Sequence, residues 1–141
     1  MASKERMLYH TNKLSYNLCL IYISLTTFHA ILILRKMTTN YTVGILFLTT
    51  VTVLMLGFLT AVKVMAYSIK YGYVAIALGV YQIIQMFTIP DVFQGNAKLF
   101  LILILIISTV AIIASGIISI VKTKQRIQYL QLIENKVAKE K

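Results

Sequence analysis

Four long apolar runs dominate the chain, and short polar segments separate them. The runs cover residues 14–34, 41–67, 71–89 and 99–121. Each contains roughly 19–27 residues, and a helix needs about 20 residues to cross the hydrocarbon core of a bilayer. Lipid offers the backbone no hydrogen-bond partner, so a spanning segment of this kind must be an α-helix. The pattern therefore predicts an all-α integral membrane protein with four transmembrane helices.

The connections between the runs are short. They cover residues 35–40, 68–70 and 90–98. Because short connections make consecutive helices antiparallel neighbours, we expect an up-down bundle. Pro90 is expected to end the third helix, since proline lacks the amide N–H that a helix uses. Gly95 and Asn96 are expected to supply the turn before the fourth helix.

The chain after the fourth run, residues 122–141, contains neither Pro nor Gly. Its apolar residues Ile127, Leu130, Ile133 and Val137 recur at spacings of three, three and four, which places them on one stripe of a helix. We therefore expect span four to continue into a basic amphipathic helix. Three interpretations of the stripe stay open: contact with the anionic inner leaflet, packing on a partner or a second copy, and an accidental pattern in a helical extension.

Composition excludes several classes of protein. Hydrophobic residues make up 59% of the chain and charged residues 13%, with a mean hydropathy of +0.82. A soluble domain has about 25% charged residues, so an ordinary soluble domain is excluded. Cys19 is the single cysteine, which excludes a disulfide scaffold. The net charge of +10 does not indicate nucleic acid here, because the charges lie between the apolar runs or at their ends.

The basic residues predict the orientation of the chain. With both termini in the cytoplasm, eleven Lys and Arg residues lie inside and three lie outside. The inside set is Lys4, Arg6, Lys13, Lys63, Lys70, Lys122, Lys124, Arg126, Lys136, Lys139 and Lys141, and the outside set is Arg35, Lys36 and Lys98. The chain accordingly divides into a cytoplasmic N-terminal tail (1–13), a four-span domain (14–121) and a cytoplasmic tail helix (122–141). The excess of Lys over Arg, with many Ile and Asn residues, indicates a bacterial plasma (inner) membrane.

Small residues at helical spacing mark faces on which helices can approach closely in lipid. They are Gly57, Ala61, Gly72, Ala75, Gly79, Ala111, Ser115 and Ser119. These faces serve either packing within the bundle or contact with another membrane protein.

Span one carries a polar stripe that includes a histidine. Ser15, Cys19, Tyr22, Thr26 and His29 recur at spacings of four, three, four and three, so they share one helix face. His29 is interpreted either as a proton-sensitive or ligand-contacting group or, more simply, as an interhelical hydrogen-bond partner.

Three further polar residues lie within the other apolar runs. Lys63 lies close to the end of the second run, so it either extends its ammonium group to the headgroups or contacts a substrate or lipid. Gln82 and Gln85 lie three residues apart in the third run. An unpaired amide in lipid costs several kcal/mol, so both should face protein or water. They form either a hydrogen-bonded seam between helices or the lining of a substrate path.

Candidate catalytic groups are not apparent in the sequence. The acids Glu5, Asp91, Glu134 and Glu140 all lie outside the apolar runs, and no pair of them is placed as a general acid and base. No metal-ligand spacing, cofactor motif or phosphate-binding loop appears. We therefore expect a non-enzymatic accessory or assembly subunit of a larger membrane complex, plausibly a transport system, without a cofactor. Its partners would be lipid and other membrane subunits or a second copy.

A second function stays open from the sequence. Four spans are too few to enclose a wide pore, but a homo-oligomer could form a small channel or transporter. Its path would be lined by Thr49, Thr52, Gln82, Gln85 and His29.

Overall fold

The computed structural model describes residues 11–36, 40–89 and 93–139. Side chains are described throughout these ranges except at 40–42 and 136–139. Four helices account for the regular structure: α2 (Lys13–Leu34), α3 (Asn40–Met65), α4 (Ile69–Phe87) and α5 (Asn96–Lys139). No strand occurs within the described ranges, so the all-α prediction is confirmed for them.

Three of the four helices are long and apolar enough to cross a membrane. They are α2, the part of α3 from Val43 to Met65, and α5 from Asn96 to Asn135. The 19 residues of α4 rise about 28 Å, close to the thickness of the hydrocarbon core. However, α4 contains Lys70, Gln82 and Gln85, which lower its apolar character. Length and composition therefore support three spans, and the fourth stays a prediction.

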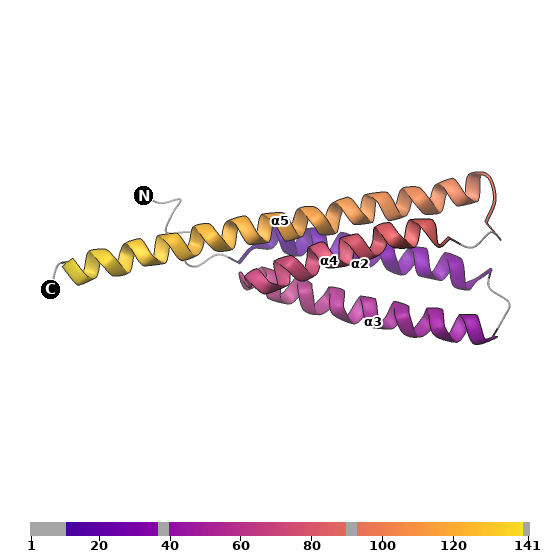
Figure 1. Ribbon diagram of the computed structural model, residues 1–141, viewed down its shortest axis with the longest axis horizontal. Helices are drawn as coiled ribbons and strands as arrows, with labels where there is room; N and C mark the ends of the chain where they lie inside the picture. Colours follow the sequence, from indigo (N-terminus) through magenta and orange to yellow (C-terminus); the bar gives the residue numbers. More distant parts are fainter. Residues whose placement is uncertain (1–10, 37–39, 90–92, 140–141) are drawn as a thin grey trace.

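The four helices form a ring of antiparallel neighbours. α5 packs against α2 and α4, and α3 completes the ring by packing against the same two helices. Figure 1 shows that α3 lies close to α4 near the turn that joins them and diverges from it toward its own first residue. Figure 1 also shows α5 running on past the ends of the other helices, on the side of the molecule where α2 begins.

Local backbone features set the ends of the helices. The turn between α3 and α4 covers residues 66–68, slightly earlier than the connection expected at 68–70. Within it, Tyr67 adopts a left-handed backbone with φ of 59° and its N–H donates to the Val64 carbonyl at 3.2 Å. Gly95, with φ of 57°, directly precedes α5, as the sequence predicted. Glycine adopts this conformation without a steric penalty. Pro90, expected to end the third helix, lies outside the described residues.

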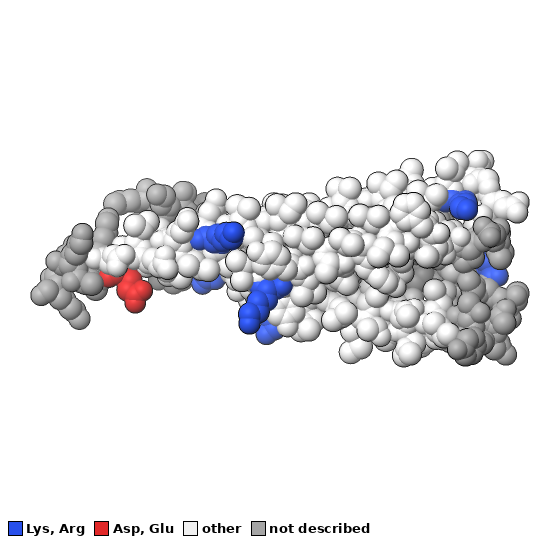
Figure 2. Space-filling model, viewed as in Figure 1, with Lys and Arg blue, Asp and Glu red and all other residues white. Residues whose placement is uncertain are grey.

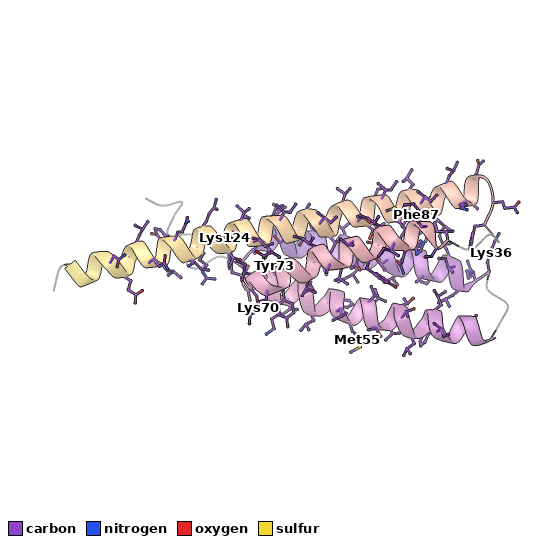
Figure 3. The ribbon with its side chains drawn as sticks, in the orientation of Figure 1. Lys36, Met55, Lys70, Tyr73, Phe87 and Lys124 are labelled. Carbon is purple, nitrogen blue, oxygen red and sulfur yellow. The ribbon has the colours of Figure 1, made fainter. Side chains whose placement is uncertain are left out.

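The outer surface of the bundle is apolar between two charged ends. Large apolar side chains are exposed along all four helices, for example Met55 on α3 and Phe87 on α4, which point away from their neighbours (Figure 3). The space-filling view shows basic groups at both ends of the bundle and an uncharged band between them (Figure 2). Lys70 and Lys124 lie at one end and Lys36 at the other (Figure 3). This surface is suited to contact with lipid tails and is compatible with a membrane location.

Candidate functional site: a polar seam inside the bundle

The polar stripe of α2 faces the interior of the bundle. Ser15, Cys19, Tyr22, Thr26 and His29 are all buried. They share one face because their spacing matches the helical repeat. In lipid, a polar side chain on an outer face would lack hydrogen-bond partners, so the inward orientation is the favourable one. The seam is therefore built on α2 and completed by residues of α4 and α5.

A three-residue cluster joins α2, α4 and α5 at the centre of the seam. The Gln82 side chain, 1% exposed, donates through Nε2 to Thr26 Oγ1 at 3.0 Å and to Ser108 Oγ at 2.9 Å. Ser108 Oγ in turn donates to Gln82 Oε1 at 3.1 Å. The two hydroxyl oxygens of Thr26 and Ser108 are 3.3 Å apart. One amide from α4 thus satisfies hydroxyl groups from two other helices.

A second group of hydrogen bonds joins α2 directly to α5. Ser115 Oγ donates to the Ser15 carbonyl at 2.7 Å and lies 3.1 Å from Cys19 Sγ. The carbonyl of Ser15 belongs to the first turn of α2, and Ser115 lies in the middle of α5. Cys19 therefore acts as a small, buried, hydrogen-bonded packing residue in this arrangement.

Asn12 connects the start of α2 to two other helices. Its side chain donates to Ser15 Oγ at 2.8 Å and accepts from the Ser15 N–H at 3.5 Å, which caps α2. Its own N–H donates to the Met65 carbonyl at the end of α3, at 3.1 Å. Lys122 of α5 donates to Asn12 Oδ1 at 3.3 Å. One residue thus links α2, α3 and α5 at this end of the bundle.

Several buried polar atoms of the seam and its surroundings have no hydrogen-bond partner. They are Tyr22 OH, His29 Nε2, Thr60 Oγ1, Thr109 Oγ1, Ser119 Oγ, Thr123 Oγ1 and Arg126 Nε. His29 Nε2 makes none of the interhelical hydrogen bonds that its position favoured. The hydrogen-bonded clusters are therefore separate groups along the bundle rather than one continuous chain of polar partners.

The small residues singled out in the sequence all lie buried between helices of the same chain. The closest approach to a backbone atom joins α4 to α5: a Cβ added at Gly116 would lie 2.7 Å from the Gly72 carbonyl oxygen. A Cβ added at Gly72 would lie 2.6 Å from Ile120 Cγ1, and one at Gly79 would overlap Ile113. Because these faces are occupied within the bundle, they are not available to dock another protein.

The α2–α3 interface is packed less closely around its glycine than the α4–α5 interface. A Cβ added at Gly57 would meet Ile23 Cγ1 at 3.2 Å and Tyr22 Cε1 at 3.3 Å. These neighbours are side-chain atoms rather than backbone. Ala61, one turn further along α3, is buried in the same apolar cluster.

The residues proposed to line a path in an oligomer are not brought together. Gln82 and His29 are buried inside the bundle, whereas Thr49 and Thr52 are exposed on α3. The two threonine hydroxyls donate to carbonyls of their own helix, at Ile45 and Leu48, both at 2.9 Å. A single chain therefore holds His29 and Gln82 in its interior and Thr49 and Thr52 on the outer surface of α3.

The remaining polar residues of the spans lie near the surface. Gln85 is partly buried and donates to Tyr81 Oη of its own helix at 3.0 Å. Lys63 is exposed in the last turn of α3. Neither residue joins the interior clusters.

The tail stripe lies on α5 beyond the bundle. Ile127 and Leu130 are exposed and Ile133 is half-buried, while the side chain of Val137 lies outside the described ones. Just before the stripe, the Arg126 guanidinium lies over the Tyr67 ring, 4.7 Å from its centroid. This stacking joins α5 to the α3–α4 turn at the point where the bundle ends.

Three residues of the interior were missed by sequence reasoning. Asn12 directly precedes the first apolar run, and an Asn in that place is a helix-capping signal. Ser108 lies seven residues before Ser115, so the spacing that marks one face of α5 includes it. Gly116 carries no such signal, because its role depends on which helix packs against it.

No group of three or more His, Cys, Asp or Glu residues that could hold a metal ion occurs within the ranges that the structure describes. Comparison with protein-family models, curated proteins and solved structures found no match.

Proposed function

We propose that this protein is a non-enzymatic, four-span accessory or assembly subunit of a larger membrane complex, such as a transport system. The observation that carries the proposal is the length of α5. It is one helix of 44 residues, and the stretch from Ile127 to Lys139 rises about 20 Å beyond the contact of Arg126 with Tyr67. A helix that leaves its bundle with apolar residues exposed is suited to a partner.

The interior supports a structural role over a transport path in a single chain. Gln82 is fully used in holding Thr26 and Ser108 together, and Gly72 and Gly116 bring the backbones of α4 and α5 into contact. Both features stabilise one fixed arrangement of the helices. The proposed role is therefore to present surfaces rather than to move a solute.

The proposal includes a fourth span and an orientation. α4 packs along α5 and contacts α3, and it lies closest to α3 near the turn that joins them (Figure 1). Since α3 and α5 are the more apolar helices, α4 would cross the same layer with Gln82 turned to the interior and Lys70 at its end. Both termini would lie in the cytoplasm, at the end of the bundle where Lys70 and Lys124 lie (Figure 3). The membrane would be a bacterial plasma membrane.

The experiment is affinity isolation of the tagged full chain from native membranes in mild detergent, followed by native mass measurement and protein identification. We expect a stoichiometric complex with another membrane protein. Recovery of a monomer or a pure homo-oligomer would contradict the subunit role. In the second case, flux of ions or small solutes into proteoliposomes, absent from liposomes without the protein, would favour the channel instead.

A further inference from the structure

One face of α5 is buried without interruption along the whole bundle. It consists of residues at alternating spacings of three and four, with one extra spacing of four, and each of them is at most 4% exposed. They are Leu101, Leu105, Ser108, Ile112, Ser115, Ser119 and Thr123. We call this face the α5 seam. α2 and α4 cover it from both sides.

The same register continues past the end of the bundle. The next positions are Arg126, Leu130, Ile133 and Val137, at spacings of three, four, three and four from Thr123. Such a repeat keeps its residues on one face of a helix. The Arg126 guanidinium lies over the ring of Tyr67, in the turn between α3 and α4. Leu130 is 41% exposed. No other described helix of the bundle therefore covers this face from here on, although apolar residues continue along it.

The direction of α5 beyond the bundle limits which molecules can contact its exposed apolar residues. α5 leaves the bundle along the bundle axis without a bend (Figure 1), and neither Gly nor Pro follows Gly116. A tail along the axis of a membrane-embedded bundle points away from the bilayer, so it cannot lie flat on the leaflet. The occupant must approach from the aqueous side.

Charge limits the occupant further. Residues 122–141 contain six basic residues and two acidic ones, Glu134 and Glu140, a net charge of +4. Lys63 and Lys70 are exposed at the same end of the bundle. A second copy would bring two such tails together, and like charges across an interface are unfavourable. An acidic partner would be attracted instead.

We propose that the extension of the α5 seam beyond the bundle, at Arg126, Leu130 and Ile133, docks an acidic amphipathic helix of a partner protein, which extends the bundle into the aqueous phase. This inference rests on the proposed subunit function and names the chemistry of the partner. Apolar residues of that helix would pack on Leu130 and Ile133. Glu134 is the one charged residue between Arg126 and Lys136, so the carboxylates of the partner would pair with the basic residues that precede and follow this stretch in the sequence. The contact would be one between two helices, in which apolar residues at spacings of three and four pack together.

The test uses the full chain in nanodiscs of phosphatidylcholine and a fluorescent synthetic helix of three heptads. The helix carries Leu at the 3–4 spacing and Glu at the flanking positions, and a matched peptide carries Lys in place of Glu. We expect the acidic peptide to raise fluorescence anisotropy and the basic peptide not to. Empty nanodiscs measure binding to lipid alone. Equal binding of the two peptides to the protein would overturn the proposal.

Matched variants locate the binding site. The double variant Leu130→Asp with Ile133→Asp is expected to weaken binding about tenfold or more. The control Leu132→Asp alters a residue that is 61% exposed but lies about 160° around the helix from Leu130. It should change binding less than about twofold. Because these residues lie beyond the bundle, the thermal stability of all variants should match that of the wild type, and unchanged binding in the double variant would overturn the proposal.

Other occupants give distinct results. If removal of residues 1–10 strengthens peptide binding, the seam is covered by the chain itself and the proposal is wrong. A dimer that dissociates in the double variant would make a second copy the occupant and overturn the proposal equally. If the double variant still purifies with its native complex, the subunit function stands and only the docking inference fails. If the wild type purifies alone although the acidic peptide binds, the subunit function fails.

Discussion

α5 and α3 are both long apolar helices, yet they occupy opposite positions in the bundle. Half of the most apolar stretch of α5 is buried inside the protein, against 17% of the corresponding stretch of α3. Of the two stretches, the one in α5 is the more apolar. In a soluble protein the more apolar helix would be expected inside for that reason. In a bilayer that reason would not apply, because lipid tails are as apolar as leucine side chains.

Small and polar residues at regular spacing decide which of the two helices is more deeply buried. α5 places Ser108, Ser115 and Gly116 on the face that meets α2 and α4, where they form hydrogen bonds and allow close approach. α3 offers Gly57 and Ala61 toward α2 but satisfies its Thr49 and Thr52 hydroxyls within its own backbone. α5 is thus the more buried helix because its neighbours offer hydrogen bonds and close packing that lipid tails could not provide.

Adding a methyl group where the backbones of two helices lie closest should have the largest effect on stability. Gly116→Ala would place a Cβ 2.7 Å from the Gly72 carbonyl oxygen, which is backbone and cannot move aside easily. We expect the free energy of unfolding in detergent to fall by about 1–3 kcal/mol. The control is Gly44→Ala, where nothing lies within 4 Å of the added Cβ. Equal stability of the two variants would show that α4 and α5 are not packed in this way.

Removing the central amide tests the hydrogen-bonded part of the interior. Gln82→Leu keeps the approximate volume but removes the hydrogen bonds to Thr26 and Ser108. Interhelical hydrogen bonds in membranes contribute about 0.6 kcal/mol each, and up to about 1.7, so a loss of about 1–2 kcal/mol is expected in the same unfolding measurement. Gln85→Leu, whose amide bonds only within α4, serves as the control and should lose less. A larger loss in that control would contradict the arrangement described.

Breaking the stacking at the end of the bundle should have a smaller effect. Arg126→Gln removes the guanidinium that lies over the Tyr67 ring. Such a contact contributes about 0.5–1 kcal/mol at exposed sites. The readout is the unfolding free energy together with crosslinking between α5 and the α3–α4 turn, which should decrease. Lys124→Gln is the matched control on the exposed side of the same turn.

The looser interface provides the mildest test. Gly57→Ala would place a Cβ 3.2–3.3 Å from atoms of the Ile23 and Tyr22 side chains, which can adjust by a few tenths of an ångström. The gain in helix propensity of about 1 kcal/mol on replacing Gly offsets this crowding. We expect a change within about 0.5 kcal/mol of wild type. A loss as large as that of Gly116→Ala would remove the contrast between the two interfaces.

Much of the helical content was readable from the sequence. Apolar runs of membrane-spanning length gave four helices because lipid permits little else, and Gly95 marked the turn before α5 since its neighbours are polar. The end of α3 was placed two residues too late. Tyr67 continues the apolar pattern of residues 41–67, but its left-handed backbone belongs to the turn.

The candidate site was readable only in part. The periodic stripe on α2 identifies Thr26 and Cys19 as members of a polar face. The sequence does not distinguish the two amides of α4, Gln82 and Gln85, and predicts that both face protein or water. Only Gln82 reaches the interior cluster, because a shift of three residues moves Gln85 toward Tyr81 on its own helix. Which partners a polar residue meets depends on how neighbouring helices rotate about their axes. The spacing of residues along one helix does not show how its neighbours are rotated.

The unbroken course of α5 has a mechanical consequence. A helix with neither Gly nor Pro after Gly116 has no hinge, so its tip and its membrane-embedded part form one rigid lever. A tilt of about 10° at the bundle would displace the end of the stretch from Ile127 to Lys139 sideways by about 3.5 Å, given its rise of about 20 Å. Bilayer thickness influences such tilts. A protein attached to that tip would therefore be moved by changes in the membrane that it does not itself touch.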